Sequence, residues 1–120
     1  MTQIIAKQEF DYNSVLSLAN RFELNREQIR RILGISESTQ FRYEKKNPVL
    51  NSNLQDRWLR LVRVVNLAID LFEDDAEVKR WLSSLKSSLG DRIPLELLES
   101  ESGSREVEQV LLQASYGVFG

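Results

Sequence analysis

Apolar residues recur three and four positions apart along nearly the whole chain, and no stretch keeps the two-residue alternation of a half-buried strand. Val15, Leu18, Ala19 and Phe22 are typical of this spacing, which gathers side chains on one face of a helix. With 42% hydrophobic residues among 120, the chain has enough apolar surface for a real core. The sequence therefore predicts an all-α fold, a compact multi-helix protein of about seven helices.

Capping residues predict the helix boundaries in the first half of the chain. Asn, Ser and Asp favour helix starts, Gly tolerates the left-handed geometry of a helix end, and Pro disfavours helix in the residue before it. The predicted boundaries are a start at about Asp11, an N-cap at Asn25 with Gln28 as capping-box partner, a stop at Gly34, an N-cap at Ser36 and a stop before Asn47-Pro48.

The second half begins with a predicted capping box at Ser52 and Gln55, followed by a long central helix that reaches Phe72. Shorter helices should follow, and Pro94 suits the first position of one of them. They are expected as a helix bearing Val78, Trp81, Leu82 and Leu85, a Ser/Gly loop to Arg92, a short helix at Leu95 to Leu98, a break at Gly103-Ser104, and a last helix bearing Val107, Val110, Leu111 and Ala114 that ends at Gly117.

The sequence contains neither Cys nor His. Disulfides, thiol nucleophiles and thiolate metal sites are therefore excluded, as are the commonest general base and the commonest metal ligand. Residues 1–7 lack the basic start and apolar run of a signal peptide, and no apolar run approaches the roughly 20 residues that cross a bilayer. We expect a soluble, intracellular protein of the cytoplasm that is not an enzyme and needs no cofactor.

Charge is distributed unevenly along the chain. Residues 1–63 carry 11 Lys/Arg against 7 Asp/Glu, and residues 64–120 carry 5 against 11. A basic first half suits contact with nucleic acid, and an acidic second half suits a basic partner. The alternative interpretation is that the two halves attract each other within one fold.

The segment from Asn25 to about Lys46 has the order of a helix-turn-helix, in which the second helix enters the major groove of DNA. Arg30 stands where such motifs usually carry a small residue, and Gln40 stands where an inward aliphatic residue is usual, so Gln40 needs a buried partner or a rotated helix. Two helices that pack without touching DNA remain the alternative. The candidate DNA-binding residues are Ser36, Ser38, Thr39, Arg42, Tyr43 and Lys45, with Arg26 and Lys46 better placed for phosphates.

Other charged groups have simpler interpretations than a reaction site. Arg57, Arg60 and Arg63 would either extend a phosphate-binding surface or form a solvated helix face. The acidic run 73–77 lacks the spaced ligands and inner Gly of a calcium loop, so helix capping is expected instead of a metal site. Nothing near Glu96, Glu99 and Glu101 suggests a substrate pocket for paired catalytic carboxylates.

One ordered set of residues in the second half is more specific than any single motif. It comprises Phe72, Trp81-Leu82, Leu89-Gly90, Pro94-Leu95-Glu96-Leu97-Leu98, Gly103, Val107, Leu111 and Tyr116-Gly117-Val118. This set resembles the toxin-binding domain of the Xre/MbcA/ParS class of bacterial antitoxins. The resemblance extends over the helix-turn-helix and Arg60-Leu61, as in the Xre-like N-terminal regions of that class.

The resemblance implies a helix-turn-helix region at residues 1–66 and a toxin-binding domain at residues 67–120. It implies an antitoxin that covers the active site of a co-encoded toxin, usually one with a RES fold that uses NAD. It also implies binding of operator DNA, with a homodimer inside a toxin–antitoxin hetero-oligomer. Ile93 departs from the hydrogen-bonding N-cap usual before Pro94. The implied toxin-binding residues are Trp81, Leu89, Gly90, Pro94, Leu95, Tyr116, Gly117, Val118 and Phe119.

The final residues have a physical interpretation of their own. Tyr116 and Phe119 are aromatic side chains on either side of Gly117, and aromatic residues often anchor interfaces. Only three residues follow Gly117, so any inserted plug should be short. The alternative is that both rings cap the core, with Tyr116 folded onto Trp81 or Leu98. A transcriptional regulator with a dimerising C-terminal domain and a helical adaptor without DNA contact are the rival functions.

Overall fold

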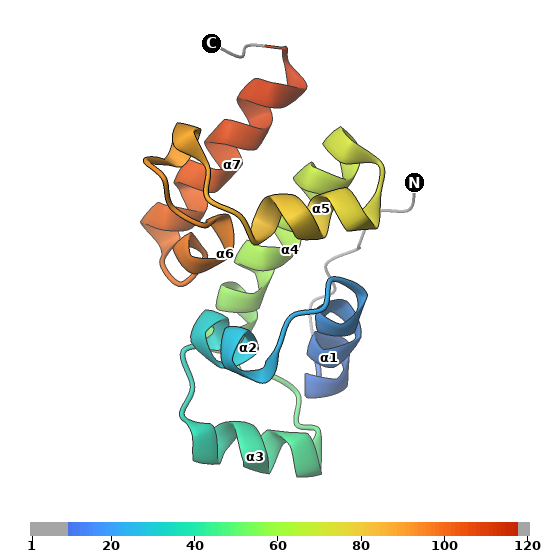
Figure 1. Ribbon diagram of the computed structural model, residues 1–120. Coiled ribbons are helices and arrows are strands. Elements are labelled where there is room, and N and C mark those ends of the chain that lie inside the picture. The colour runs from blue at the N-terminus through green and yellow to red at the C-terminus, as the bar shows by residue number, and fades with distance from the viewer. Residues whose placement is uncertain (1–9, 118–120) are drawn as a thin grey trace.

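The computed structural model describes residues 10–117, and within this range it confirms the all-α fold (Figure 1). Two isolated bridges, Asp11 with Val49 and Lys86 with Arg92, are the only β-type pairings among the described residues. The helices are α1 (Tyr12–Arg21), α2 (Arg26–Leu33), α3 (Glu37–Lys46), α4 (Ser52–Phe72), α5 (Asp75–Leu82), α6 (Pro94–Leu97) and α7 (Glu101–Ser115), with a 3-10 turn, η1, at Ser87–Leu89.

The helix boundaries predicted for the first half are confirmed. Asn25 and Gln28 form the reciprocal capping box, in which the Asn25 side chain accepts from the Gln28 amide at 2.8 Å and Gln28 accepts from the Asn25 amide at 2.8 Å. The Ser36 hydroxyl caps α3, while Gly34 and Asn47 end α2 and α3 in the left-handed conformation. These short-range hydrogen bonds fix where α2 and α3 begin and end.

The capping box predicted at Ser52 and Gln55 is wrong by one residue. The N-cap of α4 is Asn51, whose side chain accepts from the Leu54 amide at 3.0 Å. The Gln55 side chain donates instead to the Leu50 carbonyl at 3.2 Å. Asn and Ser cap helices about equally well, so the composition of this segment does not decide between neighbouring positions.

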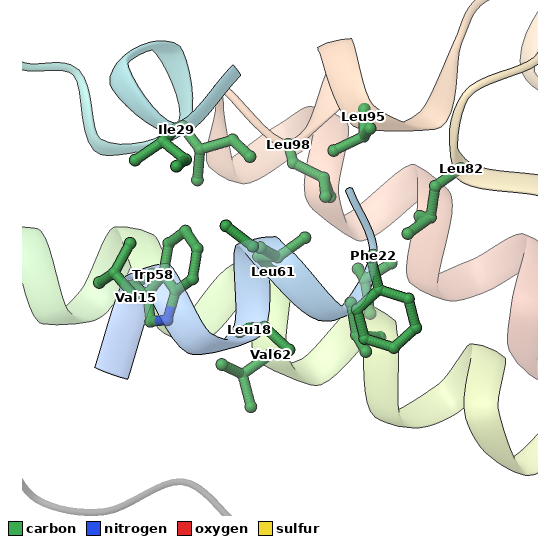
Figure 2. Close-up of a cluster of buried hydrophobic side chains, with 14 of the residues drawn as sticks. Val15, Leu18, Phe22, Ile29, Trp58, Leu61, Val62, Leu82, Leu95 and Leu98 are labelled. Atoms are coloured by element: carbon green, nitrogen blue, oxygen red, sulfur yellow. The ribbon is translucent and has the colours of Figure 1, made fainter. Parts of the chain in front are cut away.

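Helix α4 lies at the centre of the molecule, as its apolar pattern predicted, and α7 packs along it (Figure 1). Trp58, Leu61, Val64 and Ile69 of α4 have no exposed surface. Figure 2 shows that side chains from both halves of the sequence meet on α4. They are Val15, Leu18 and Phe22 of α1, Ile29 of α2, Trp58, Leu61 and Val62 of α4, Leu82 of α5, and Leu95 and Leu98 at α6.

The expected helix around Trp81 is shorter than the sequence indicated. It ends at Leu82, and Leu85 is 64% exposed in the connection that follows. That connection contains η1, closed by a hydrogen bond from the Lys86 amide to the Arg92 carbonyl at 3.1 Å. Apolar spacing alone continued the helix too far, because it does not show that Leu85 lacks a neighbour to pack against.

The break predicted at Gly103-Ser104 is also wrong. Both residues are buried within α7, which begins at Glu101 with Ser100 as its N-cap. A Cβ atom at position 103 would lie 2.2 Å from the Leu97 carbonyl oxygen, so only Gly lets α7 approach α6 this closely. Gly103 therefore serves close packing between helices, not a turn.

The expected division between residues 66 and 67 falls inside α4, which continues unbroken from Ser52 to Phe72. The buried core is one cluster that contains residues from both sides of this point, from Phe10 to Leu111. The two expected domains therefore share a helix and a core. Among residues 10–117, no helix is both long and apolar enough to cross a membrane.

Candidate functional site

The outward face of α3 carries most of the side chains predicted to meet DNA. Ser38, Arg42, Lys45 and Lys46 are exposed there. Ser36 and Thr39 are occupied locally, because the Ser36 hydroxyl accepts from the Thr39 amide at 3.1 Å and donates to the Thr39 hydroxyl at 2.9 Å. The exposed residues thus offer a hydroxyl and three cations, whereas Ser36 and Thr39 mainly set where α3 begins.

Gln40 and Arg30, the two departures from the usual helix-turn-helix pattern, are hydrogen-bonded to each other. Arg30 Nη1 donates to Gln40 Oε1 at 3.3 Å, and Gln40 Nε2 donates to the Arg26 carbonyl at 2.8 Å and to the Tyr12 hydroxyl at 3.4 Å. The Gln40 side chain is completely buried. It therefore has the buried partners that the sequence analysis required, and it ties α3 to α1 and α2.

Arg26 has a partner that the phosphate prediction did not anticipate. Its guanidinium makes a two-pronged ion pair with Glu44 of α3, at 2.7 and 2.9 Å. The hydrogen bond to Glu44 raises the pKa of Arg26, so the pair stays charged. A phosphate would have to compete with Glu44 for this guanidinium, which makes Lys46 the freer of the two predicted phosphate contacts.

The Tyr43 side chain faces the core more than the solvent. It is half-buried and packs edge-on against Tyr12, with ring centroids 5.9 Å apart, while Arg42 lies over its ring at 5.6 Å. Burial raises the pKa of the Tyr12 hydroxyl beneath it. Tyr43 therefore supports α3 and directs Arg42 outward.

The arginines of α4 follow neither of the two interpretations offered from the sequence. Arg57 donates to the Leu33 carbonyl at 2.8 Å and so caps the end of α2. Arg60 binds Glu101 at 2.9 Å, and Arg63 binds Glu108 of α7 at 3.4 Å. The row joins α4 to α2 and α7, because each guanidinium meets an acceptor on a neighbouring helix.

Ion pairs also connect the basic first half with the acidic second half. Arg21 at the end of α1 binds Asp75 at the start of α5 through two hydrogen bonds, at 2.8 and 2.9 Å. Lys79 binds Glu23 at 2.7 Å. The Arg21, Arg60 and Arg63 pairs join cations of the first half to carboxylates of the second, as the alternative interpretation of the charge asymmetry expects, whereas the Lys79–Glu23 pair runs in the opposite direction.

The acidic residues singled out in the sequence lie at a helix cap and beside a small pocket. Asp74 caps α5, as expected for the 73–77 run, with its side chain accepting from the Ala76 amide at 2.9 Å. Among the described residues, no group of three carboxylates could hold a metal ion. Glu96 and Glu99 line a shallow pocket with Arg31 of α2, whose volume of about 120 Å³ is below the roughly 300–1,000 Å³ usual for ligand pockets.

The residues predicted on the α5–α6 side divide into buried and accessible ones. Leu89, Pro94 and Leu95 are buried, so they shape this region and do not themselves offer surface. Trp81 is half-buried beside Phe72, with ring centroids 6.2 Å apart. Gly90 is exposed and left-handed at φ 67°, a conformation that favours Gly.

The end of α7 is exposed and apolar. Tyr116 is 78% exposed, which contradicts the alternative that it folds back onto Trp81 or Leu98. Leu112, one turn earlier, is 36% exposed, and Gly117 follows in the left-handed conformation. The predicted contacts Val118 and Phe119 lie outside the described residues.

Three exposed apolar residues, Phe41, Val49 and Leu112, were not singled out in the sequence analysis. Phe41 on α3 is 56% exposed, and Leu112 on α7 stands beside the fully buried Leu111. Phe41 and Leu112 each follow a fully buried residue, Gln40 and Leu111, and lie about 100° away from it around the helix axis.

The two candidate surfaces lie at opposite ends of an elongated molecule. Its principal extents are 46 × 29 × 23 Å, and Figure 1 shows α3 at one end and the last turn of α7 at the other. The central helix α4 lies between them. One protomer can therefore contact two partners at these surfaces without overlap.

Comparison with known proteins separates the chain at the same point as the sequence analysis. Residues 7–66 match the antitoxin Xre-like helix-turn-helix domain, and residues 67–117 match the antitoxin Xre/MbcA/ParS C-terminal toxin-binding domain. Antitoxin Xre of Yersinia enterocolitica is 33% identical over 93 residues, which are 77% of this chain and 63% of that protein. Antitoxin Xre of Pseudomonas putida is 32% identical over 76 residues, 63% of this chain and 47% of that protein. The chain thus spans about half to three fifths of the length of these relatives.

Proposed function

The chain belongs to the Xre-type antitoxin family, and we propose that it neutralises a toxin by direct contact through the end of α7. The observation that carries this proposal is the exposure of Tyr116 and Leu112 on a helix whose inner face is fully packed. The core does not need these two side chains. Exposed aromatic and aliphatic anchors of this kind are typical of binding surfaces.

The proposed partner is a RES-fold toxin that uses NAD, with the end of α7 placed over its active-site mouth. The family resemblance of residues 72–118 supports this class of partner. Charge supports a basic surface on it, since residues 64–120 carry 11 acidic against 5 basic side chains. The protein would act by obstruction, as a binding protein and not an enzyme.

Removal of residues 116–120 from the full-length chain tests the proposal. The truncated protein should keep its helical content and melting temperature, because Tyr116 contributes little to the core. Its complex with the product of the adjacent gene should weaken by at least tenfold, about 1.4 kcal/mol. Leu112→Ala should weaken the complex in the same direction, and Val49→Ala, at an exposed apolar residue in the connection between α3 and α4, is the control.

Normal toxin inhibition by a destabilised truncated protein would contradict the proposal. The toxin-binding role assigned to residues 67–120 is best tested in the full chain. A fragment starting at residue 67 would lose the first 15 residues of α4, against which α7 packs. We expect such a fragment not to fold by itself.

A second role, binding of operator DNA through α3, is supported by the exposed cations on its outward face and by the helix-turn-helix match. We propose a homodimer on a short inverted repeat, because one protomer offers few phosphate contacts. Arg42→Ala should cost roughly 1–3 kcal/mol if Arg42 reads a guanine edge. A mobility-shift assay in which Arg42→Ala and Lys46→Ala together change nothing would remove α3 from the interface.

The rival function is a helix-turn-helix regulator whose C-terminal region only dimerises. It shares the DNA contacts of α3 but assigns Tyr116 and Leu112 to a second copy of the chain. Sedimentation of the protein lacking residues 116–120 distinguishes the two. A fall to monomer with unchanged toxin binding supports the regulator, whereas an unchanged assembly state with lost toxin binding supports the antitoxin.

A further inference from the structure

Phe41 has no role in the core and none in the cation contacts proposed above. Its ring is 56% exposed on α3, next to the completely buried Gln40. Scattered exposed apolar residues are common, so exposure by itself indicates nothing. The neighbours of Phe41 on α3 give the exposure its meaning.

Phe41 belongs to one stripe along the outward face of α3. Ser38, Phe41, Arg42 and Lys45 follow the spacing i, i+3, i+4 and i+7, which places four side chains on one side of a helix. The Lys45 ammonium lies 4.6 Å from the centre of the Phe41 ring. This cation–π contact holds the ring on the stripe, away from the core.

We infer that Phe41 is a specificity-determining residue that reads the C5-methyl group of thymine in the major groove. This inference rests on the proposed DNA-binding role of α3. The thymine methyl is the apolar mark in the major groove, and Phe is among the side chains suited to contact it. If the stripe enters the groove, Arg42 brings hydrogen-bond donors to base edges and Phe41 brings an apolar surface beside them.

The stripe itself carries two cations, Arg42 and Lys45, while Glu44, one turn from Phe41, is held in an ion pair with Arg26. This arrangement favours DNA over a second copy of the same face. Two copies of the stripe packed together would bring Arg42 and Lys45 of one protomer against the same cations of the other. Like charges in contact oppose such an interface, whereas phosphates attract them. The stripe therefore fits an anionic partner that also presents an apolar group, as DNA does with its phosphates and the thymine methyl.

The test uses duplexes that the wild-type protein selects from a random-sequence pool, resynthesised with deoxyuridine in place of thymine at one position at a time. This change removes only the methyl group, and synthetic DNA carries no methylated cytosine. Burial of one such group is worth about 0.8 kcal/mol, so we expect about fourfold weaker binding at one or two positions. Phe41→Ala should weaken binding to the thymine duplex and bind both duplexes equally.

Leu85→Ala, a change at a similarly exposed apolar residue in the connection between α5 and α6, should keep both the affinity and the fourfold discrimination. Wild-type binding that is insensitive to every thymine replacement would overturn the inference and leave DNA binding intact. Discrimination that persists in Phe41→Ala would also overturn it. Failure of the wild-type protein to select any duplex would overturn both this inference and the DNA role, but not the proposed toxin neutralisation.

Discussion

Helices α3 and α7 carry the two candidate surfaces, and they are attached to the molecule in opposite ways. The only fully buried side chain of α3 is polar, that of Gln40, held by hydrogen bonds to α1 and α2. Helix α7 instead buries Val107 and Leu111 against α4 and brings Gly103 against α6. Apolar packing is strong but tolerant in direction, while hydrogen bonds demand one geometry. Directional hydrogen bonds thus hold α3, the helix expected to read DNA, in one orientation. Apolar burial holds α7, the helix expected to carry the toxin contacts.

The only two fully buried polar side chains among the described residues sharpen this contrast. Gln40 satisfies both ends of its amide, whereas the Ser104 hydroxyl on α7 has no hydrogen-bond partner. An unsatisfied buried hydroxyl is destabilising. The buried amide of Gln40 therefore helps to hold α3 in place, whereas the buried hydroxyl of Ser104 destabilises the packing of α7.

Leu111→Ala should have the largest effect on stability and so test the apolar attachment of α7. Leu111 is completely buried, so its truncation should lower the free energy of unfolding by about 2–5 kcal/mol. Urea denaturation followed by circular dichroism measures this. The neighbouring Leu112→Ala is the matched control and should stay within about 0.5 kcal/mol. Equal effects at the two positions would show that α7 does not pack as described.

Gln40→Met should have the next largest effect, because it keeps the volume but leaves Arg30 and Tyr12 without their hydrogen-bond partner. We expect a loss of about 1–3 kcal/mol in thermal denaturation, with a larger loss of DNA affinity than of stability. A double-mutant cycle with Arg30→Met should give a coupling energy of about 0.5–3 kcal/mol. Strict additivity of the two changes would mean that the Arg30–Gln40 hydrogen bond contributes nothing.

Ser104→Ala should act in the other direction and raise stability by about 1 kcal/mol, because it removes a buried hydroxyl without a partner. Ala is also the better helix former. Ser102→Ala, an exposed change on the same helix, controls for that propensity. Destabilisation by Ser104→Ala would indicate that the hydroxyl is satisfied in solution.

The smallest expected effect concerns Arg21 and Asp75, which join the two halves at the surface. The hydrogen bond from Arg21 holds the pKa of Asp75 below its ordinary value. Its contribution is therefore complete above the unfolded pKa of about 3.9 and is lost as pH falls through the lower folded value. At neutral pH we expect Asp75→Asn to cost about 0.2–1 kcal/mol, since the pair is exposed.

That difference between wild type and Asp75→Asn should shrink as pH falls through the lowered folded pKa of Asp75, and it should vanish once the Asp75 carboxyl is protonated. Denaturation curves at several pH values measure it. Asp91→Asn, the same change at an exposed carboxylate without a described ion pair, is the matched control. A stability difference that persists in acid would assign the effect to packing and not to charge.

Local signals in the sequence predicted the fold well because they act over a few residues. Asn25, Gly34 and Ser36 are identified by hydrogen bonds and backbone angles that need no tertiary information. Leu85 and Gly103 misled the analysis because their roles depend on tertiary surroundings: Leu85 is 64% exposed beyond the end of α5, and the Leu97 carbonyl lies against Gly103.

The candidate sites were predicted less completely, for the same reason. The sequence identifies Arg26 as a cation on a helix-turn-helix but does not show that Glu44 occupies it. It flags Arg30 and Gln40 as separate departures, although they are one hydrogen-bonded pair. Exposure of Arg42 and Lys45 could be anticipated, because charged side chains are seldom buried without a partner, whereas Tyr116 could not be assigned from its residue type.

Because α4 is one continuous helix, its length sets the orientation of the end of α7 relative to α3. Each residue of a helix advances it by 1.5 Å and turns it by about 100°. One extra residue in the middle of α4 would thus swing the end of α7 to another side of the molecule relative to α3. Among relatives we expect insertions and deletions in the connections at 47–51 and 83–93. We expect none within α4, because only the insertion of whole turns would keep the orientation of α7 relative to α3.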